Sequence, residues 1–243
     1  MKVNHEVTER ANIVCFTIPM RSVSSAIVGG GVLNDVLTVV NYSLGKTENT
    51  LPDDIVSYTE NCFNVETELS NKMVVICTVV PAEHSKACTV FDELTGLEAH
   101  AFVTAGLGNR RSFEDPAVCN EEADRSKECR SVGTINIILA VNRPLTIEAH
   151  LELYALIAQI KVHVVESFRL PSPVSGLVSS GTGTDCVVVC APMINQVDVP
   201  PLQFAGMYTM LAKIAGSAVS TALTLAIQGW MTAHTEVRPL KHC

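Results

Sequence analysis

The sequence predicts an α+β domain in which a mixed, mostly antiparallel sheet packs against two long helices and a short one. Apolar runs of strand length cluster in the first part of the chain, and the two longest helical patterns come late. Strands and helices do not alternate regularly, as they would in a doubly wound parallel sheet. No tandem repeat or dividing linker is visible, so residues 1–243 are expected to form a single domain.

The composition is that of a folded chain with an acidic surface. Hydrophobic residues make up 47% of the chain and charged residues 17%, which favours a large core and argues against disorder. The net charge of −8 argues against nucleic acid and anionic membranes as partners. The segment Met1–Arg10 is polar, unlike a secretory signal. Nine cysteines scattered through apolar runs fit reduced thiols in the cytoplasm better than a disulfide framework.

Six or seven strands are expected, and six apolar runs can be assigned to them. Each run is bounded by turn or polar residues, as buried strands usually are. The first run is expected to end at Pro19, because proline has no N–H to donate to a sheet. The six predicted strands are Ile13–Ile18, Val36–Val40, Met73–Val80, Ala99–Ala105, Ile135–Val141 and Cys186–Cys190.

Two of the predicted helices have recognisable first turns. Pro52 stands at the start of a short helix over Asp53–Phe63, since proline is favoured near the first helical position. Thr146 is the predicted N-cap of a long helix with Ala149 at its third position. Apolar residues then follow at helical spacing as far as Phe168.

The third predicted helix, Phe204–Gly229, is rich in small residues. Its small-residue face of Ala212, Gly216 and Ser220 permits close packing, either within the chain or between subunits of a homo-oligomer. It also contains the most membrane-like stretch, Ile214–Ile227. That stretch is shorter than the roughly 20 apolar residues that span a bilayer, so we expect a buried helix.

The segment Arg110–Arg130 is strongly charged and predicts a long solvated loop. Loops longer than about 12–15 residues are usually functional lids or disordered insertions, and both alternatives stay open. Cys119 and Cys129 lie near the two ends of the most charged part of this loop, where they could form a pair, sense redox state or remain free surface thiols.

Two glycine–threonine loops stand directly before buried strands. Gly181–Asp185 precedes Cys186–Cys190, and Gly133–Asn136 runs into Ile137–Val141. Glycines let the backbone approach a ligand closely, and the threonine hydroxyls and the Asp185 carboxylate supply polar groups. The alternative is an ordinary turn in which Asp185 caps backbone amides. If the two loops meet in the fold, they contribute to one polar site.

Further motifs accompany these loops in a definite order. They are Ser24-Ser25-Ala26 before Gly29-Gly30, Asn41, Thr104–Asn109 with Asp115-Pro116, Gly133–Ile138, the helix that carries Lys161, Gly181–Asp185, and Phe204-Ala205-Gly206. Each motif alone is weak, but their order and spacing are more specific. Over about Ser22 to Ala222 the chain resembles the adenosylcobinamide amidohydrolase family of cobalamin salvage.

The resemblance implies hydrolysis of the amide that joins the aminopropanol arm to the corrin ring of adenosylcobinamide, giving adenosylcobyric acid. The partner is then a small-molecule corrinoid. Cobalt enters only as part of this substrate, and no separate cofactor is implied. Matching by position gives the pocket candidates Ser24, Ser25, Asn41, Asn109, Thr134, Asn136, Lys161, Thr182, Thr184 and Asp185.

Amide hydrolysis needs an activated nucleophile, a stabilised oxyanion and an acid for the leaving amine. Asp185 is the best carboxylate for activating water or orienting a hydroxyl. Lys161 is expected to be half-buried and to act as a base or polarise a carbonyl, unless its stem carries the ammonium out to solvent. Thr134 could be the nucleophile or could bond its own loop. Asn109 and Asn136 could donate to an oxyanion or simply close turns.

Three positions depart from the family pattern. The pattern has Asn before the glycine pair, Glu two residues before the helix lysine, and His after Phe204–Gly206. This chain has Val28, Gln159 and Met207-Tyr208 there. A non-catalytic corrinoid-binding protein on the same fold is therefore an alternative, as is an amidohydrolase with a different amide substrate.

Other kinds of site have less support. Cys77, His84 and Cys88 invite a zinc interpretation, but no Cys-x-x-Cys accompanies them and Cys77 lies in a predicted strand. Cys186 and Cys190 face the same side of a strand, which is typical of core packing. His163, on the long helix, has no partners in the order of a catalytic triad. Neither a Walker nor a Rossmann fingerprint is present.

Overall fold

The computed structural model describes residues 1–44, 72–117 and 133–241. The predicted helix Asp53–Phe63, Cys119 and Cys129 lie outside these ranges, as does most of the charged segment predicted as a loop. The fold below concerns the described residues.

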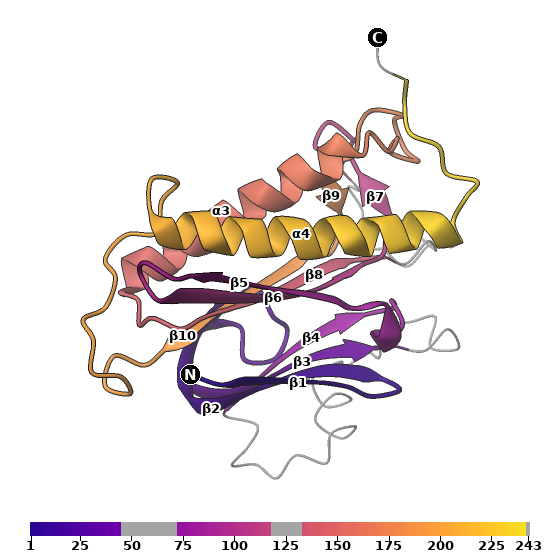
Figure 1. The fold of residues 1–243 in the computed structure, drawn as a ribbon. Helices are drawn as coiled ribbons and strands as arrows, with labels where there is room; N and C mark the ends of the chain where they lie inside the picture. Colours follow the sequence, from indigo (N-terminus) through magenta and orange to yellow (C-terminus); the bar gives the residue numbers. More distant parts are fainter. Residues whose placement is uncertain (45–71, 118–132, 242–243) are drawn as a thin grey trace.

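An eight-stranded sheet forms the centre of the structure, with the order β4-β3-β2-β10-β8-β6-β5 and β1 paired to β2 (Figure 1). Two neighbouring pairs, β8–β10 and β3–β4, are parallel, and the others are antiparallel. The prediction of a mixed, mostly antiparallel sheet is therefore confirmed. The strands are β1 Val3–Val7, β2 Ala11–Ser24, β3 Gly31–Ser43, β4 Met73–Thr78, β5 Lys86–Asp92, β6 Leu97–Ala105, β8 Ile135–Val141 and β10 Cys186–Pro192.

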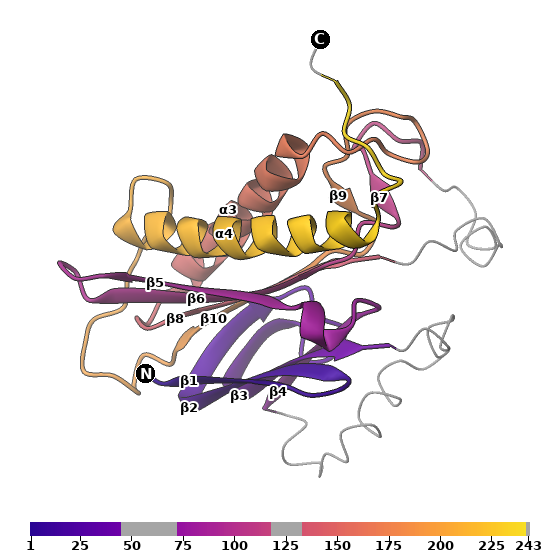
Figure 2. The ribbon, with the colours of Figure 1, turned by 45° about the vertical axis from the view of Figure 1, so that its right-hand side comes forward.

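The helices and the two halves of the curved sheet form successive layers. Helices α3 (Ile147–Ser167) and α4 (Met210–Ala233) cover one face of the half formed by β5, β6, β8 and β10. The half formed by β1–β4 lies on the opposite face, so the sheet curves back over itself (Figures 1 and 2). Both faces of β8 and β10 are consequently buried along their whole length. A short ribbon of β7 (Arg110–Arg111) and β9 (Gly181–Thr182) stands apart from the main sheet.

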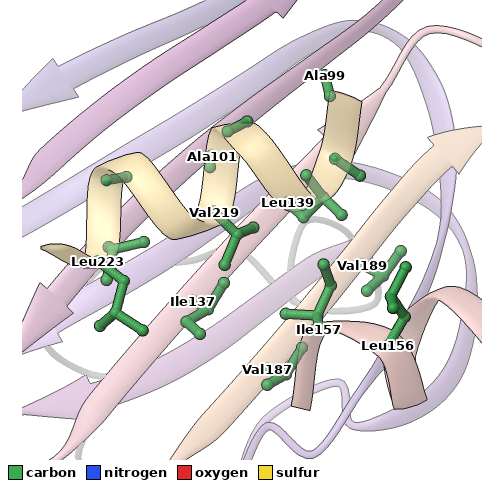
Figure 3. Packing of buried hydrophobic residues seen from close by; sticks show 14 of the residues in the cluster. Ala99, Ala101, Ile137, Leu139, Leu156, Ile157, Val187, Val189, Val219 and Leu223 are labelled. Atoms are coloured by element: carbon green, nitrogen blue, oxygen red, sulfur yellow. The ribbon is translucent and has the colours of Figure 1, made fainter. Parts of the chain in front are cut away.

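The two faces of the central strands carry separate cores. Residues at odd positions of β8 and β10 pack under the helices, and those at even positions pack against β2, β3 and β4. In the first core, apolar side chains from both helices meet those of three strands (Figure 3). Side-chain alternation along a strand explains this division, because successive residues point to opposite faces. The labelled members in Figure 3 are Ala99, Ala101, Ile137, Leu139, Leu156, Ile157, Val187, Val189, Val219 and Leu223.

Helix α3 begins where the sequence predicted. The Thr146 hydroxyl accepts a hydrogen bond from Ala149 N at 3.3 Å, which is the capping contact expected of a helix N-terminus. Helix α4 begins at Met210 rather than at Phe204, so that predicted boundary is wrong. Thr209 is its N-cap and accepts from Ala212 N at 3.1 Å.

Helix α4 is a core helix. It is long and apolar enough to cross a membrane, but most of its apolar residues are buried against the sheet and α3. The prediction of a buried helix is therefore confirmed. Gly216 lies against α3, where an added Cβ would be 3.0 Å from Ile160 Cδ1. The small residue at this position thus serves packing within the chain.

The strands differ from the predicted ones mainly at their ends. Strand β2 runs through Pro19 to Ser24, because the register with β3 shifts between Cys15 and Met20 and the proline falls in that irregularity. Strand β3 is longer at both ends than predicted, and β4 ends two residues earlier, at Thr78. Strands β1 and β5 were not predicted, since both expose alternate or most residues and lack an apolar run.

The fully buried His150 gives a prediction for the pH dependence of stability. Its ring nitrogens lie 3.2 Å from Thr146 O and 3.4 Å from Arg21 O. Burial lowers the pKa of His150 below its ordinary value of 6.5; the two hydrogen bonds to carbonyl oxygens oppose this in part, and the charge of Arg21 adds to it. Between the lowered pKa and about 6.5, His150 is therefore mostly protonated in the unfolded chain and mostly neutral in the folded chain. The free energy of unfolding should fall as the pH drops below about 6.5.

Urea unfolding between pH 7.5 and pH 5.5 would measure this effect. His150→Asn should flatten the fall in the unfolding midpoint, and His163→Asn, at an exposed position of the same helix, is the control that should not. Burial also lowers the pKa of His5, which would leave a residual slope in the variant. Equal slopes for wild type and His150→Asn would contradict the assignment.

Candidate active site

The two glycine–threonine loops meet, as the sequence predicted. Strands β8 and β10 are parallel, and their register places Asn136 opposite Cys186, so the segments before the two strands lie side by side. The Thr134 hydroxyl donates to Thr184 O at 2.6 Å, and the Thr184 hydroxyl donates to Gly133 O at 3.1 Å. This reciprocal pair of hydrogen bonds joins the loops at the edge where both strands begin.

The Asp185 carboxylate is held by four donors. Its Oδ1 accepts from Ile135 N at 3.0 Å and from the Thr182 hydroxyl at 2.5 Å. Its Oδ2 accepts from Thr182 N at 3.1 Å and from the Lys161 ammonium. One side chain thus connects its own loop, the start of β8 and helix α3. Because each carboxylate oxygen already accepts two hydrogen bonds, Asp185 is well suited to hold these neighbouring groups in place.

Lys161 reaches this carboxylate from the second half of α3. Its side chain is 16% exposed and forms an ion pair with Asp185, whose side chain is 9% exposed. The expectation of a half-buried stem is confirmed, and the ammonium turns toward the loops rather than toward solvent. Gly181 permits the contact, because a Cβ there would lie 2.5 Å from Asp185 Oδ2 and 2.9 Å from Lys161 Nζ.

A second group of polar side chains lies on the inner face of the same edge. Asn136 Nδ2 donates to Asn41 Oδ1 at 2.8 Å and to Cys77 O at 2.9 Å, and Asn41 Nδ2 donates to the Thr104 hydroxyl at 2.9 Å. Asn136 and Thr104 are 0% exposed and Asn41 is 3% exposed. The Thr134 hydroxyl lies 3.5 Å from Asn136 Oδ1, which links this group to the loops.

Ser24 and Ser25 lie at the end of β2, beside the first residues of β10. The Ser25 hydroxyl accepts from Val187 N at 3.3 Å and donates to Cys186 Sγ at 3.4 Å. Ser25 is exposed, whereas Ser24 is buried. Burial raises the pKa of the Cys186 thiol; the Ser25 hydrogen bond opposes this and the negative charge of Asp185 adds to it. The thiol therefore stays protonated and is unsuited to nucleophilic attack.

Asn109 lies against the glycine that precedes Thr134. A Cβ added to Gly133 would lie 2.7 Å from Asn109 Oδ1 and 2.4 Å from Gly106 O, so only glycine allows the two loops to approach this closely. All ten candidate residues therefore lie along one edge of the sheet. Asn41, Asn136 and Ser24 are buried there, and Ser25, Asn109, Thr182 and Thr184 are partly or fully accessible.

The charged segment beside the site is more ordered than the sequence predicted. Arg110 is buried, and its Nε donates to Pro171 O at 2.6 Å. The Asp115 side chain is 1% exposed and accepts from the Ser172 hydroxyl at 2.6 Å and from the Ser175 hydroxyl. The prediction of a solvated loop is thus wrong for Arg110 and Asp115, whose partners at 171–175 are distant in sequence, whereas Phe113 and Glu114 are exposed as predicted.

The three departures from the family pattern lie outside the Lys161–Asp185 cluster. Val28 forms an isolated bridge with Val75 at the edge of β4. Gln159 is exposed on α3 and Tyr208 is fully exposed. The loop that carries Tyr208 is anchored to Glu152, which accepts from Ala205 N at 2.7 Å. Lys161 is farther along α3 by about 13 Å.

The arrangement offers a hydroxyl, an ammonium and a carboxylate from three separate segments. These are the kinds of group that can supply nucleophilic attack and charge stabilisation on a carbonyl compound. Sequence reasoning missed Thr104, Cys186 and Asp115 as parts of this region. Thr104 and Asp115 stood in family motifs, whereas no local signal distinguishes Cys186. No group of three or more His, Cys, Asp or Glu side chains within 1–44, 72–117 and 133–241 could hold a metal ion.

Comparisons with known proteins give a remote likeness in solved structures. The L-aminopeptidase D-Ala-esterase/amidase from Ochrobactrum anthropi is 11% identical with a TM-score of 0.44, and the match covers 93% of this chain and 82% of that one. The PH0078 protein from Pyrococcus horikoshii OT3 is 11% identical with a TM-score of 0.44, covering 98% and 88%. A Burkholderia sp. beta-aminopeptidase is 13% identical with a TM-score of 0.43, covering 96% and 82%.

The search of curated proteins finds no significant match. A single family model matches residues 1–235, which is nearly the whole chain and includes every candidate residue described above. The model is that of adenosylcobinamide amidohydrolase, and the chain belongs to this family of amide hydrolases.

Proposed function

We propose that the chain hydrolyses the aminopropanol amide of adenosylcobinamide and releases adenosylcobyric acid, as a cytoplasmic enzyme of cobalamin salvage. One observation carries this proposal. In a chain of the adenosylcobinamide amidohydrolase family, Thr134, Lys161 and Asp185 come together at one edge of the sheet. Those three groups can supply the nucleophile and the fixed charge that amide hydrolysis needs.

Thr134 is the proposed nucleophile. Its oxygen attacks the carbonyl carbon of the amide, the C–N bond breaks, and the Thr134 proton ends on the leaving aminopropanol nitrogen. The acyl group is then an ester of Thr134. Water cleaves this ester, returning a proton to the threonine oxygen and releasing the carboxylic acid. Dividing a difficult hydrolysis into two easier steps is the general advantage of covalent catalysis.

Lys161 and Asp185 have supporting roles in this scheme. The ammonium of Lys161 places a positive charge beside the loop, where it can stabilise the developing oxyanion or protonate the departing amine. Asp185 binds both Lys161 and Ile135 N, the amide that follows Thr134. It therefore sets the position of the cation relative to the nucleophile, and we assign it an orienting role.

The proposed substrate contacts follow from exposure. Ser25, Asn109, Thr182 and Thr184 are accessible and are proposed to bind the peripheral carboxamides of the corrin ring. Asn41, Asn136 and Ser24 are buried, so their proposed part is support of the pocket rather than direct contact. Since no departure from the family pattern lies in the Lys161–Asp185 cluster, an active enzyme is favoured over a corrinoid-binding protein without activity.

Incubation of the purified protein with adenosylcobinamide tests the proposal directly. Chromatography and mass spectrometry should find adenosylcobyric acid. Thr134→Ala should lower kcat by at least about 100-fold, whereas Thr134→Ser, which keeps the hydroxyl, should retain much of it. A spectral shift of the corrinoid without product would indicate a binding protein. Neither product nor shift would mean that the amide substrate is a different one.

Gly181 provides a test of the ion pair that removes neither charged group. Gly181→Ala puts a methyl group 2.5 Å from Asp185 Oδ2, so the carboxylate and Lys161 must move. We expect kcat to fall about tenfold and stability to fall by about 1–3 kcal/mol, as for other cases of overpacking. Gly183→Ala is the matched control, since nothing lies within 4 Å of a Cβ at that position. Kinetics and thermal unfolding that do not distinguish the two variants would refute the role of the pair.

A further inference from the structure

A buried series of hydrogen bonds leads from β6 to the proposed nucleophile. It passes from the Thr104 hydroxyl to Asn41, from Asn41 to Asn136, and from Asn136 toward Thr134. Its members come from β6, β3, β8 and the loop before β8, and none is more than 5% exposed. Thr104 and Asn136 are register partners on neighbouring strands, and Asn41 bridges them from the opposite half of the sheet.

The direction of every hydrogen bond in this series is determined by one carbonyl. Cys77 O can only accept, so the group of Asn136 that lies 2.9 Å away must be its Nδ2. The second N–H of Asn136 Nδ2 points to Asn41. The Asn41 atom that it meets must accept, so that atom is Oδ1. Asn41 Nδ2 is thereby turned to the Thr104 hydroxyl, which accepts. The remaining Asn136 Oδ1 faces Thr134.

This geometry gives the Thr134 hydroxyl two acceptors and no donor among the described residues. Thr184 O at 2.6 Å takes its proton, and Asn136 Oδ1 at 3.5 Å is the second acceptor in reach. With its proton directed to these oxygens, the hydroxyl keeps its lone pairs free for a carbonyl carbon. An Asn136 amide turned the other way would offer N–H groups to those lone pairs instead.

We propose that Thr104 is a positioning residue, which acts through Asn41 and Asn136 to hold the Thr134 oxygen ready for attack. The inference rests on the proposed function in which Thr134 is the nucleophile. Without the Thr104 oxygen, Asn41 Nδ2 loses its acceptor inside the protein. A buried amide without a partner favours displacement of the Asn41 side chain, and Asn136 would then keep only Cys77 O as a firm acceptor, so that its Oδ1 is held less firmly beside Thr134.

A purely structural role for the same series makes a different prediction. Buried hydrogen-bonded groups stabilise a fold when satisfied, so losing one would lower stability without a selective effect on the chemical step. Thr78 offers the matched control for this alternative. It is 3% exposed, and its hydroxyl accepts one hydrogen bond, from Val80 N at 3.1 Å. Thr78→Val therefore removes a comparable buried interaction outside the series.

The experiment compares Thr104→Val, Thr104→Ser and Thr78→Val with wild type. Thr104→Val should lower kcat for adenosylcobinamide roughly tenfold to 100-fold, the size of effect that a misplaced reacting group produces, with KM nearly unchanged. Thr104→Ser should restore kcat, because it keeps the hydroxyl oxygen. Thr78→Val should show the loss of stability without the loss of kcat. Equal kcat values for Thr104→Val and Thr78→Val would overturn the proposal.

Side-chain amide exchange supplies a readout that does not depend on activity. In NMR spectra of wild type, the Nδ2 protons of Asn136 should exchange slowly with solvent, because both are bonded to buried acceptors. Their exchange should become at least about tenfold faster in Thr104→Val and stay slow in Thr78→Val. An inactive wild type would defeat the proposed function alone. Unchanged exchange in Thr104→Val would defeat the inference, whatever the activity.

Discussion

The geometry of the candidate site depends on the hydrogen bonds that the Asp185 carboxylate accepts. The carboxylate accepts from the backbone at the start of β8, from its own loop and from Lys161 on α3, so it joins three segments that are remote in sequence. A carboxylate buried to this extent is stabilising only when its donors surround it, and removing one partner of such a pair typically costs about 3–5 kcal/mol. Gly181 makes this arrangement possible, because a side chain at that position would overlap the Asp185 carboxylate and the Lys161 ammonium.

The curvature of the sheet places a second set of polar groups against the first. Strand β3 is not a neighbour of β8 in the sheet order, yet Asn41 of β3 bonds Asn136 of β8. This contact exists because β2–β4 fold back over the central strands and enclose the second core. The site therefore combines an outer cluster, held by Asp185, with an inner series of buried amides. Thr134 lies where the two meet.

The position of the departures from the family pattern bears on whether the chemistry is retained. Gln159 and Tyr208 are exposed, and Val28 completes a backbone bridge at the edge of β4. A change at an exposed position or in a bridge leaves the contacts of Lys161 and Asp185 as they are. The groups proposed to carry out the reaction are thus complete in this chain, which fits its membership of a family of amide hydrolases.

Elements with local sequence signals could be predicted without the structure. Apolar runs located six strands, the Thr146 cap located α3, and the order of the motifs indicated the family. The contacts between those elements became visible in the folded chain: the pairing of Asn41 with Thr104, the burial of the Asp115 side chain, and the ion pair of Lys161 with Asp185. The reason is physical. Propensity and capping act within a few residues, whereas a polar group is buried or paired by whichever distant segment the folded sheet places beside it.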